Sequence, residues 1–502
     1  MKIVVIGAGA IGLSCAYYLA KAGAEVTVLD AAEPGAGASR RNAGWVVPSM
    51  SEPVPSPAAL RQAVRWAWRR DSPLRVKPSL DRSWITFMSR MVMSCRRRTY
   101  EAGLLAIAEL NRTTRQAFDE IEADGVRFEH HRAGTLFAFT TSDTIEAHLA
   151  DLDAMTAFGT PPARFLSGDD ARSLEPALSQ AVVGAILSPG ERHVDPSSFV
   201  DGMVRACTEL GVKIIGGARV VNLHTRGNRA SAALGGSAWP ADAFVLAAGV
   251  WSPGVLRSAG IKLPVQPGKG YGLDFTPSPV QLHRSIYLAD HKVAVTPLDR
   301  GVRICGTMEF TGIDYSIDAV RAAAIARAAD LYLDGWPKAR TPAPWASLRP
   351  MTPDGLPIIG TLPGLHNVAI ATGHAMLGIT LAPVTGQSIA RVLLDKADLP
   401  VLRPFAPSRF RALAHGIGLA PGIHTCPRET HERANPMAEP SHDRRIRPAD
   451  RRGASKRGPA RHTCRRRLAS RRRAEASRIP RVRNDRGCQH HWRDQVGRAG
   501  RI

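Results

Sequence analysis

The chain has 502 residues, 44% of them hydrophobic, which is enough for two or three globular domains with a large core. It lacks any run of about 18 apolar residues, and its short N-terminal apolar run is broken by glycines, so neither a membrane-spanning helix nor a signal peptide is expected. The net charge of +23 is uneven, because residues 421–502 alone carry +15. The seven cysteines have no paired spacing and indicate no disulfide framework. We therefore expect a cytoplasmic protein, with peripheral contact with the inner face of the cell membrane left open.

The first thirty residues predict a nucleotide-binding unit. An apolar, β-branched strand at 2–6 leads into a G-x-G-x-x-G turn, a helix to about Ala22 and a second strand at 25–29. Glycine-rich turns occur in other folds, but the complete unit at this spacing favours a dinucleotide. The glycines allow a tight turn and close approach to a pyrophosphate, and the helix N-terminus offers free N–H groups. The expected binding residues are Gly7, Gly9, Ala10, Ile11, Gly12 and, for the ribose hydroxyls, Asp30.

The next region combines a long loop with helices. Residues 31–44 are too polar for a core strand, and they bring hydroxyl, guanidinium and amide donors close to the ribose position. Helices are expected within 61–125, the longest over 99–123, and over 145–157, with strands at 126–129 and 134–140. We interpret the arginines of the early helices as a solvated face and expect no specific binding of nucleic acid.

The middle of the chain alternates helices and strands. Asp195 is a predicted N-cap for a helix to about Leu210, followed by strands at 211–215 and 218–223. We expect the strand at Val220 to lie beside the adenine ring. An apolar strand at 243–248 ends in small residues and suits a further loop under the same cofactor.

The last part of the body repeats the opening pattern. A strand pair at 292–297 and 302–306 precedes a helix over 317–333, whereas the proline and glycine spacing of 344–360 predicts no regular element. A strand at 368–371 then enters a glycine turn and a helix that starts near Leu377.

Beyond about residue 413 the hydrophobic periodicity ends. The arginine-rich segment 413–502 is predicted to be disordered, because it cannot bury enough apolar surface to offset its chain entropy. Its histidines and cysteines have no zinc-ligand spacing, and no metal site is expected. An out-of-frame or read-through origin is our preferred interpretation over a functional tail.

Three motifs in fixed order carry a family resemblance. They are Asn-Ala-Gly-Trp-Val-Val-Pro-Ser (42–49), Arg-Pro-Met-Thr-Pro-Asp-Gly-Leu-Pro-Ile-Ile-Gly (349–360) and Gly-His-Ala-Met-Leu-Gly (373–378). Residues 1 to about 412 resemble the FAD-dependent D-amino acid oxidase superfamily, most closely the bacterial D-amino acid dehydrogenases (small subunit type). The resemblance implies FAD as the cofactor. It also implies an α/β fold, with a Rossmann-like FAD-binding domain (1–60, 165–265 and 340–412) interleaved with an α+β substrate domain (61–164 and 266–339).

The resemblance further implies a reaction. A D-amino acid would pass a hydride to flavin N5, water would hydrolyse the imino acid to a 2-oxo acid and ammonia, and the electrons would go to a quinone or another acceptor. Two alternatives stay open. One is an oxidase or dehydrogenase of glycine, sarcosine or a cyclic imino acid such as hydroxyproline or D-proline. The other is a flavin-binding remnant without turnover. The oligomeric state is not predicted.

The resemblance also assigns the site. Arg349 matches an arginine that holds the substrate carboxylate, with a loop-bracing ion pair as the alternative; Tyr271 is a substrate contact or a core residue, and Arg303 is a weaker candidate. Related glycine oxidases carry an arginine just before the turn, where this chain has Thr296-Pro-Leu298. The helix near Leu377 would stabilise reduced flavin, and His374 is favoured as a packing residue over a catalyst. The remaining flavin-side residues are Ser39, Asn42, Ala43, Gly44, Ala248, Gly249, Trp251, Gly373, Met376, Gly378 and Thr380.

Overall fold

The computed structural model describes residues 1–66, 69, 71–234, 237–336 and 342–410. A six-stranded sheet opens the fold, in the order β10-β2-β1-β14-β21-β20, and all neighbours are parallel except β20 with β21. The strands are β1 (Lys2–Ile6), β2 (Glu25–Leu29), β10 (Lys213–Ile215), β14 (Ala243–Leu246), β20 (Ile358–Thr361) and β21 (Val368–Thr372). The apolar residues of β1, β2, β14 and β21 are buried on both faces, as expected of parallel strands.

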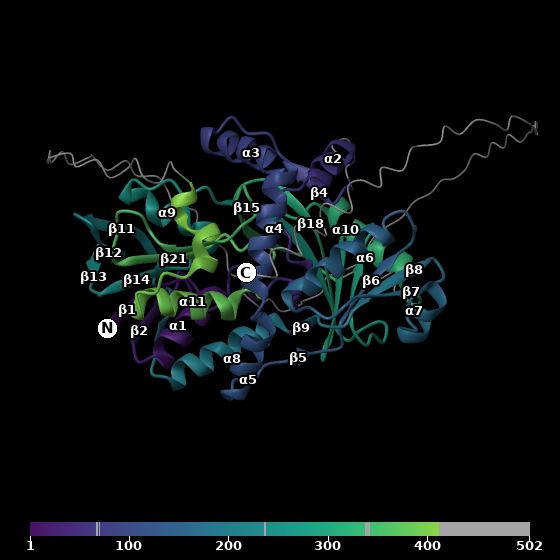
Figure 1. Ribbon diagram of the computed structural model, residues 1–502, viewed down its shortest axis with the longest axis horizontal. Coiled ribbons are helices and arrows are strands. Elements are labelled where there is room, and N and C mark those ends of the chain that lie inside the picture. The colour runs from purple at the N-terminus through teal and green to yellow at the C-terminus, as the bar shows by residue number, and fades with distance from the viewer. Residues whose placement is uncertain (67–68, 70, 235–236, 337–341, 411–502) are drawn as a thin grey trace, which may run out of the picture. The chain divides into compact units, whose positions relative to one another are not determined.

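Three helices cover one face of this sheet. They are α1 (Ala10–Lys21), α8 (Pro196–Glu209) and α11 (Ala382–Leu394), and Figure 1 shows α1 and α11 side by side. Gly23 ends α1 at φ +86°, where Ala24 N–H bonds back to the Leu19 carbonyl at 3.0 Å. The opposite face packs on a small sheet and a short helix. These elements are β11 (Val220–Arg226), β12 (Arg229–Leu234), β13 (Ser237–Trp239) and α9 (Ser252–Leu256).

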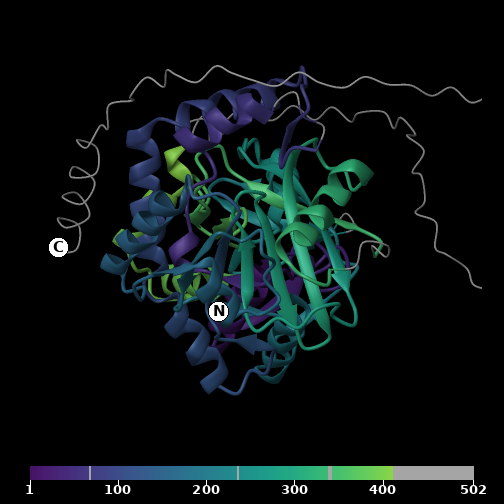
Figure 2. The same ribbon diagram turned by 90° about the vertical axis from the view of Figure 1, so that its right-hand side faces the viewer.

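A nine-stranded mixed sheet forms the second layer. Its order is β19-β15-β18-β17-β16-β6-β8-β7, and β4 pairs with β18. The strands are β4 (Leu74–Val76), β6 (Thr135–Phe139), β7 (Arg164–Ser167), β8 (Gly184–Ser188), β15 (Gln266–Phe275), β16 (Ser285–Leu288), β17 (Val293–Leu298), β18 (Gly301–Phe310) and β19 (Trp345–Met351). One face packs on α10 (Ala319–Tyr332), where the two elements share a buried core. Figure 2 shows this sheet from the side.

Most remaining helices precede residue 175. They are α2 (Pro57–Trp66), α3 (Arg82–Ser94), α4 (Arg97–Asn111), α5 (Thr114–Ala123), α6 (Ile145–Ala154) and α7 (Gly168–Leu174). A three-stranded sheet joins β3 (Trp45–Val46), β9 (Arg192–Val194) and β5 (His130–His131). In the described residues, no helix is both long and apolar enough to span a bilayer.

The structure confirms most predicted elements and corrects four. The helix expected over 99–123 is two helices, α4 and α5, and the strand expected at 126–129 is instead β5 at 130–131. Residues 345–351 form the strand β19, and β20 begins at Ile358, although the proline and glycine spacing of 344–360 argued against any regular element. β19 lies at the edge of its sheet, where Pro350 can be accommodated. The helix expected from Leu377 begins at Ala382, because residues 375–380 form turns.

The strand pairing also bears on the domain boundaries. The segments 165–265 and 340–412 were predicted to belong to the FAD-binding domain. β7 starts one residue before the first of them, β8 lies inside it, and β19 lies inside the second. All three strands nevertheless belong to the nine-stranded sheet. We therefore propose that the substrate domain includes residues 164–188 and 345–351. The interpretation of 413–502 as a disordered tail of read-through origin lies outside the described residues.

Candidate active site

The predicted cofactor segments meet at one edge of the six-stranded sheet. Parallel strands present their carboxyl ends at the same edge, and β1, β2, β14 and β21 each end in one of these segments. The residues that follow these strand ends are Gly7, Gly9, Ala10, Ile11, Gly12, Asp30, Ala248, Gly249, Trp251, Gly373, His374, Met376, Leu377 and Gly378. The sequence therefore located this cluster without any long-range information.

The glycine turn is shaped for close backbone approach. Gly7 has φ +110°, and a Cβ on Gly12 would lie 1.8 Å from the Gly7 carbonyl oxygen, so neither position tolerates a side chain. Among the described residues, an added Cβ on Gly9 would meet one heavy atom within 4 Å, the Ser39 hydroxyl oxygen at 2.9 Å. The backbone beside Gly9 is thus open to a ligand.

The N-terminus of α1 suits an anion. Its first turn contains no acidic side chain, and the Ala10 N–H donates to the Ser39 hydroxyl at 2.9 Å. Asp30 accepts from the N–H groups of Ala8 (2.6 Å) and Ala32 (2.9 Å), which fixes the carboxylate at the turn. Each carboxylate oxygen keeps a lone pair for a ribose hydroxyl.

Val220 lies next to the ribose position. The Ala218 N–H donates to the Asp30 carbonyl at 2.7 Å, and β11 begins two residues later with a buried Val220. This placement supports the predicted contact with an adenine ring, which stays a prediction.

The loop after Asp30 is braced by its own side chains. The Asn42 amide donates to the carbonyls of Ala38 (3.0 Å) and Ser39 (2.8 Å) and accepts from the Gly44 N–H (2.7 Å). Gly44 has φ +73°, and a Cβ there would lie 2.1 Å from the Val194 carbonyl oxygen. Asn42 therefore shapes the loop through its backbone, and its side chain is taken up by these bonds.

A second sheet holds the same loop. The Thr296 hydroxyl donates to the Ala43 carbonyl at 2.8 Å and accepts from the Trp45 indole N–H at 2.9 Å. Arg303 forms a two-pronged ion pair with Asp274 (2.7 and 2.9 Å) and donates to the carbonyls of Arg40 and Asn42. Both residues therefore brace the loop, and this placement argues against Arg303 as a substrate contact. No pattern in the sequence predicted the Thr296 contact.

The turn at 373–380 is tied to its neighbours in the same way. The Thr372 hydroxyl donates to the Gly249 carbonyl at 3.0 Å, and the Thr380 hydroxyl donates to the Trp45 carbonyl at 2.9 Å. His374 is buried, and its Nε2 lies 3.1 Å from the Thr385 hydroxyl; burial lowers its pKa to about 3. A neutral, buried histidine fits the packing role, whereas Met376 is 56% exposed.

Arg349 reaches the site from β19. Its Nη1 donates to the Thr307 carbonyl at 3.0 Å, and among the described residues no carboxylate pairs with the guanidinium. The Ala375 N–H donates to the Pro350 carbonyl at 3.0 Å, which places the arginine's strand against the 373–378 turn. Burial lowers the pKa of Arg349 from its ordinary value, but an arginine remains charged. A charged fork without its own carboxylate is suited to the carboxylate of a ligand.

Tyr271 lies on the other face of β15. Its side chain is buried in the core shared with α10, and its hydroxyl accepts from the Asp318 N–H at 3.3 Å. Successive strand residues point to opposite faces, so Tyr271 turns away while its neighbour Gly270 faces Arg349. This position argues against a substrate contact and for the core alternative.

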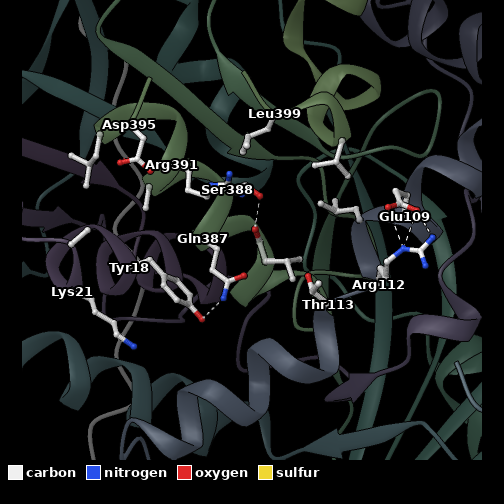
Figure 3. A pocket seen from close by; sticks show the side chains of 16 residues that line it. Tyr18, Lys21, Glu109, Arg112, Thr113, Gln387, Ser388, Arg391, Asp395 and Leu399 are labelled. Atoms are coloured by element: carbon white, nitrogen blue, oxygen red, sulfur yellow. Dashed lines mark hydrogen bonds and ion pairs between the residues drawn. The ribbon is translucent and has the colours of Figure 1, made fainter. Parts of the chain in front are cut away.

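A cavity of about 600 Å³ lies elsewhere, at the C-terminal end of α1 (Figure 3). Its walls come from α1, α4 and α11, and it contains none of the predicted site residues. Lysine and arginine side chains there are balanced by glutamate and aspartate, for example Arg112 with Glu109 at 2.8 Å. We assign it no role in the reaction.

Comparisons with known proteins point to one family. The family model for FAD dependent oxidoreductases (DAO) matches residues 2–392. D-amino acid dehydrogenase from Methylobacterium sp. (strain 4-46) is 32% identical over 82% of this chain and 100% of its own length. That of Xanthobacter autotrophicus (strain Py2) is 34% identical over 80% and 99%.

Solved structures share the fold. Glycine oxidase from Geobacillus kaustophilus superposes with a TM-score of 0.64 at 21% identity, covering 83% of this chain and 99% of that one. Iminodiacetate oxidase from Chelativorans sp. BNC1 gives 0.64 at 23%, covering 81% and 98%. The open backbone at Gly9, the unopposed N-terminus of α1 and the fixed Asp30 carboxylate fit FAD, the cofactor of the family. The chain belongs to the DAO family of FAD-dependent oxidoreductases.

Proposed function

We propose that the protein oxidises D-amino acids to 2-oxo acids and ammonia and passes the electrons to a quinone or a similar acceptor. The observation that carries the proposal is the Arg349 guanidinium, which is held at the flavin-side turn without a carboxylate partner among the described residues. The dehydrogenases reported above, at 32–34% identity over nearly their whole length, support the same substrate class.

In this proposal Arg349 binds the substrate carboxylate as a two-pronged ion pair and thereby fixes the position of the α-carbon. Bound FAD supplies the acceptor for two electrons. No general base is obvious at the site among the described residues, and none is required if the amine binds in its neutral form. Arg349 is half-buried, and the desolvation that lowers its pKa also strengthens its interaction with a carboxylate.

A substrate screen tests the proposal. Purified protein would be assayed with D-alanine, D-proline, glycine and sarcosine, following reduction of an artificial dye and, separately, formation of peroxide. Arg349→Lys is expected to raise KM for D-alanine by roughly 100-fold, since lysine cannot form the fork, while the flavin absorbance spectrum stays unchanged. Turnover of glycine or D-proline alone would favour the oxidase alternative. A protein with bound flavin and no turnover would favour the remnant.

We also propose a cytoplasmic protein that touches a membrane through the face formed by α2, β4 and α3, here called the α3 face. Residues 57–98 contain eleven lysines and arginines against two aspartates. They also expose large apolar side chains, namely Leu60, Val76, Leu80, Ile85, Val92 and Met93. Cations beside exposed apolar groups suit a surface of anionic lipid, where a quinone acceptor is dissolved. Both views place α3 at the periphery of the described residues (Figures 1 and 2).

Vesicle sedimentation tests the membrane contact. Binding to phosphatidylcholine vesicles containing phosphatidylglycerol should exceed binding to phosphatidylcholine alone and should fall with salt. Leu80→Ser combined with Val92→Ser should weaken it several-fold, because it removes exposed apolar area. The matched control is Val183→Ser, an exposed valine elsewhere in the chain. Equal binding to both vesicle types would contradict the proposal.

A further inference from the structure

Strand β18 contains a bulge beside the proposed substrate arginine. β15 and β18 pair regularly as far as Tyr271 and Gly306, and pairing resumes at Lys269 and Glu309. One residue of β15 therefore faces two residues of β18, of which Thr307 is the first. A bulge takes backbone groups out of the regular ladder, so they become available to other partners.

Thr307 adopts a backbone conformation that is rare for its type. Its φ is +66°, in the left-handed region that β-branched residues avoid. Its hydroxyl accepts from the Tyr271 N–H at 3.3 Å, and its carbonyl accepts from Arg349 Nη1 at 3.0 Å. Thr307 thus links the strained turn of the bulge to the guanidinium. Backbone strain of this kind is maintained only where the surroundings fix it.

Gly270 provides the path for the arginine. A Cβ on Gly270 would lie 2.2 Å from Arg349 Nη1 and 2.6 Å from its Cζ. Since Arg349 belongs to β19 and Thr307 to β18, the side chain crosses the strand between them over this glycine. The space above Gly270 and the bulge in β18 together determine where the guanidinium of Arg349 lies.

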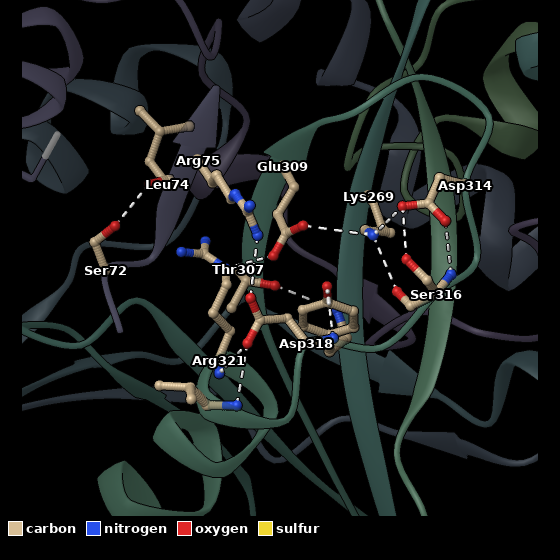
Figure 4. A network of polar contacts seen from close by, with 12 residues as sticks. Ser72, Leu74, Arg75, Lys269, Thr307, Glu309, Asp314, Ser316, Asp318 and Arg321 are labelled. Atoms are coloured by element: carbon tan, nitrogen blue, oxygen red, sulfur yellow. Dashed lines mark hydrogen bonds and ion pairs between the residues drawn. The ribbon is translucent and has the colours of Figure 1, made fainter. Parts of the chain in front are cut away.

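Buried charges fix the far side of the bulge (Figure 4). Lys269 and Glu309, the first pair after the bulge, lie opposite each other with Nζ and Oε2 3.5 Å apart. Arg321 of α10 binds the same Glu309 carboxylate, and Lys269 also binds Asp314 at 2.7 Å. Lys269, Glu309 and Arg321 are each at most 2% exposed. A one-residue slip would break these pairs, so they hold the register that creates the bulge.

We infer that Thr307 is a positioning residue, which sets the affinity for the substrate carboxylate by orienting Arg349. The inference rests on the proposed role of Arg349. With the bulge intact, the Thr307 carbonyl holds one guanidinium nitrogen and the remaining N–H groups face the ligand. Without the hydroxyl, the Tyr271 N–H loses its partner and the bulge relaxes, which turns the carbonyl away from Arg349.

The test compares Thr307→Val with Thr307→Ser in the full-length flavoprotein. Valine keeps the shape and removes the hydroxyl, so KM for D-alanine should rise about tenfold while kcat stays within about twofold. Serine keeps the hydroxyl and should behave like the parent. In an Arg349→Lys background, Thr307→Val should change KM no further, because the orienting contact is already lost.

Two outcomes would overturn the inference. One is a lower Tm for Thr307→Val with an unchanged KM, which indicates a purely structural role. The other is a full additional effect in the Arg349→Lys background. Titration with pyruvate, followed through the flavin absorbance, measures carboxylate binding without turnover. It therefore tests the positioning role of Thr307 independently of the proposed reaction. Suppose that the parent turns over no amino acid, and that Arg349→Lys and Thr307→Val each bind pyruvate more weakly than the parent does. The proposed reaction is then wrong, and the positioning role of Thr307 stands.

Discussion

Gly270 provides a sharp test at the scale of a single residue. The three atoms nearest an added Cβ all belong to the far end of the Arg349 side chain, which can move, so Gly270→Ala should fold normally and displace the guanidinium. We expect KM for D-alanine to rise by roughly 100-fold, with Tm changed by only a few degrees. Gly254→Ala is the control, because no atom lies within 4 Å of its added Cβ. Equal KM values for the two variants would contradict the proposed path of Arg349.

The positions of single residues in the fold were predictable where a short, local motif defines them. The spacing of Gly7, Gly9, Gly12 and Asp30 follows from two strands, one turn and one helix, and the structure confirms these elements, while the binding role of the four residues stays a prediction. Tyr271 shows the limit. The choice between substrate contact and core depends on which face of β15 it occupies, and the glycine-rich strand lacks the alternation that reveals faces. Thr307 gave no signal, because a bulge arises from the pairing of two strands.

At the scale of elements, helix capping makes a quantitative prediction. Asp195 caps α8 by accepting from the N–H groups of Ser197 (3.2 Å) and Ser198 (2.9 Å). Asp195→Ala should lower the free energy of unfolding by about 1–2 kcal/mol, measured by urea denaturation. Thr144 precedes α6 without a capping bond, so Thr144→Ala is the matched control and should change little. Similar losses for both variants would argue against the capping role.

Helices and strands were predictable where their own sequence pattern defines them. The predictions failed where packing against neighbouring elements decides the structure. The α8 helix begins and ends close to its predicted limits because Asp195 and Pro196 define its start. β19 was missed, since its prolines argue against a strand in general and only its place at the sheet edge makes one possible. The start of α11 was placed five residues early, because a glycine turn resembles a helix start in sequence.

At the scale of the whole molecule, the two sheets meet at the loop after β2. Thr296 and Arg303 of the nine-stranded sheet donate to carbonyls of residues 40–43, which follow the six-stranded sheet's second strand. The fold class was predictable because each nucleotide-binding segment has a local signature. The division of strands between the sheets was not, because β8 pairs with β6 and β19 pairs with β15, each more than forty residues away in sequence.

The stability of the molecule should also depend on pH through Glu191. Its carboxylate is fully buried and accepts from the Ser49 N–H at 3.1 Å, and burial raises its pKa from 4.5 to about 7. Below pH 4.5 the group is protonated in both the folded and the unfolded state and contributes nothing. Between pH 4.5 and 7 the unfolded chain ionises first, so stability falls as pH rises, and the full cost persists above pH 7.

Glu191→Gln removes this titration while keeping an oxygen for the Ser49 N–H. As the pH rises from 4 to 8, the unfolding free energy of the variant should rise by about 3 kcal/mol relative to that of the parent. The difference in stability at any one pH also includes the effect of burying the new amide. The change of that difference with pH is therefore the decisive measurement. Urea denaturation at several pH values provides it, with the exposed Glu209→Gln as control. A Glu191→Gln curve parallel to that of the parent would show that this carboxylate ionises as readily in the folded protein as in the unfolded chain.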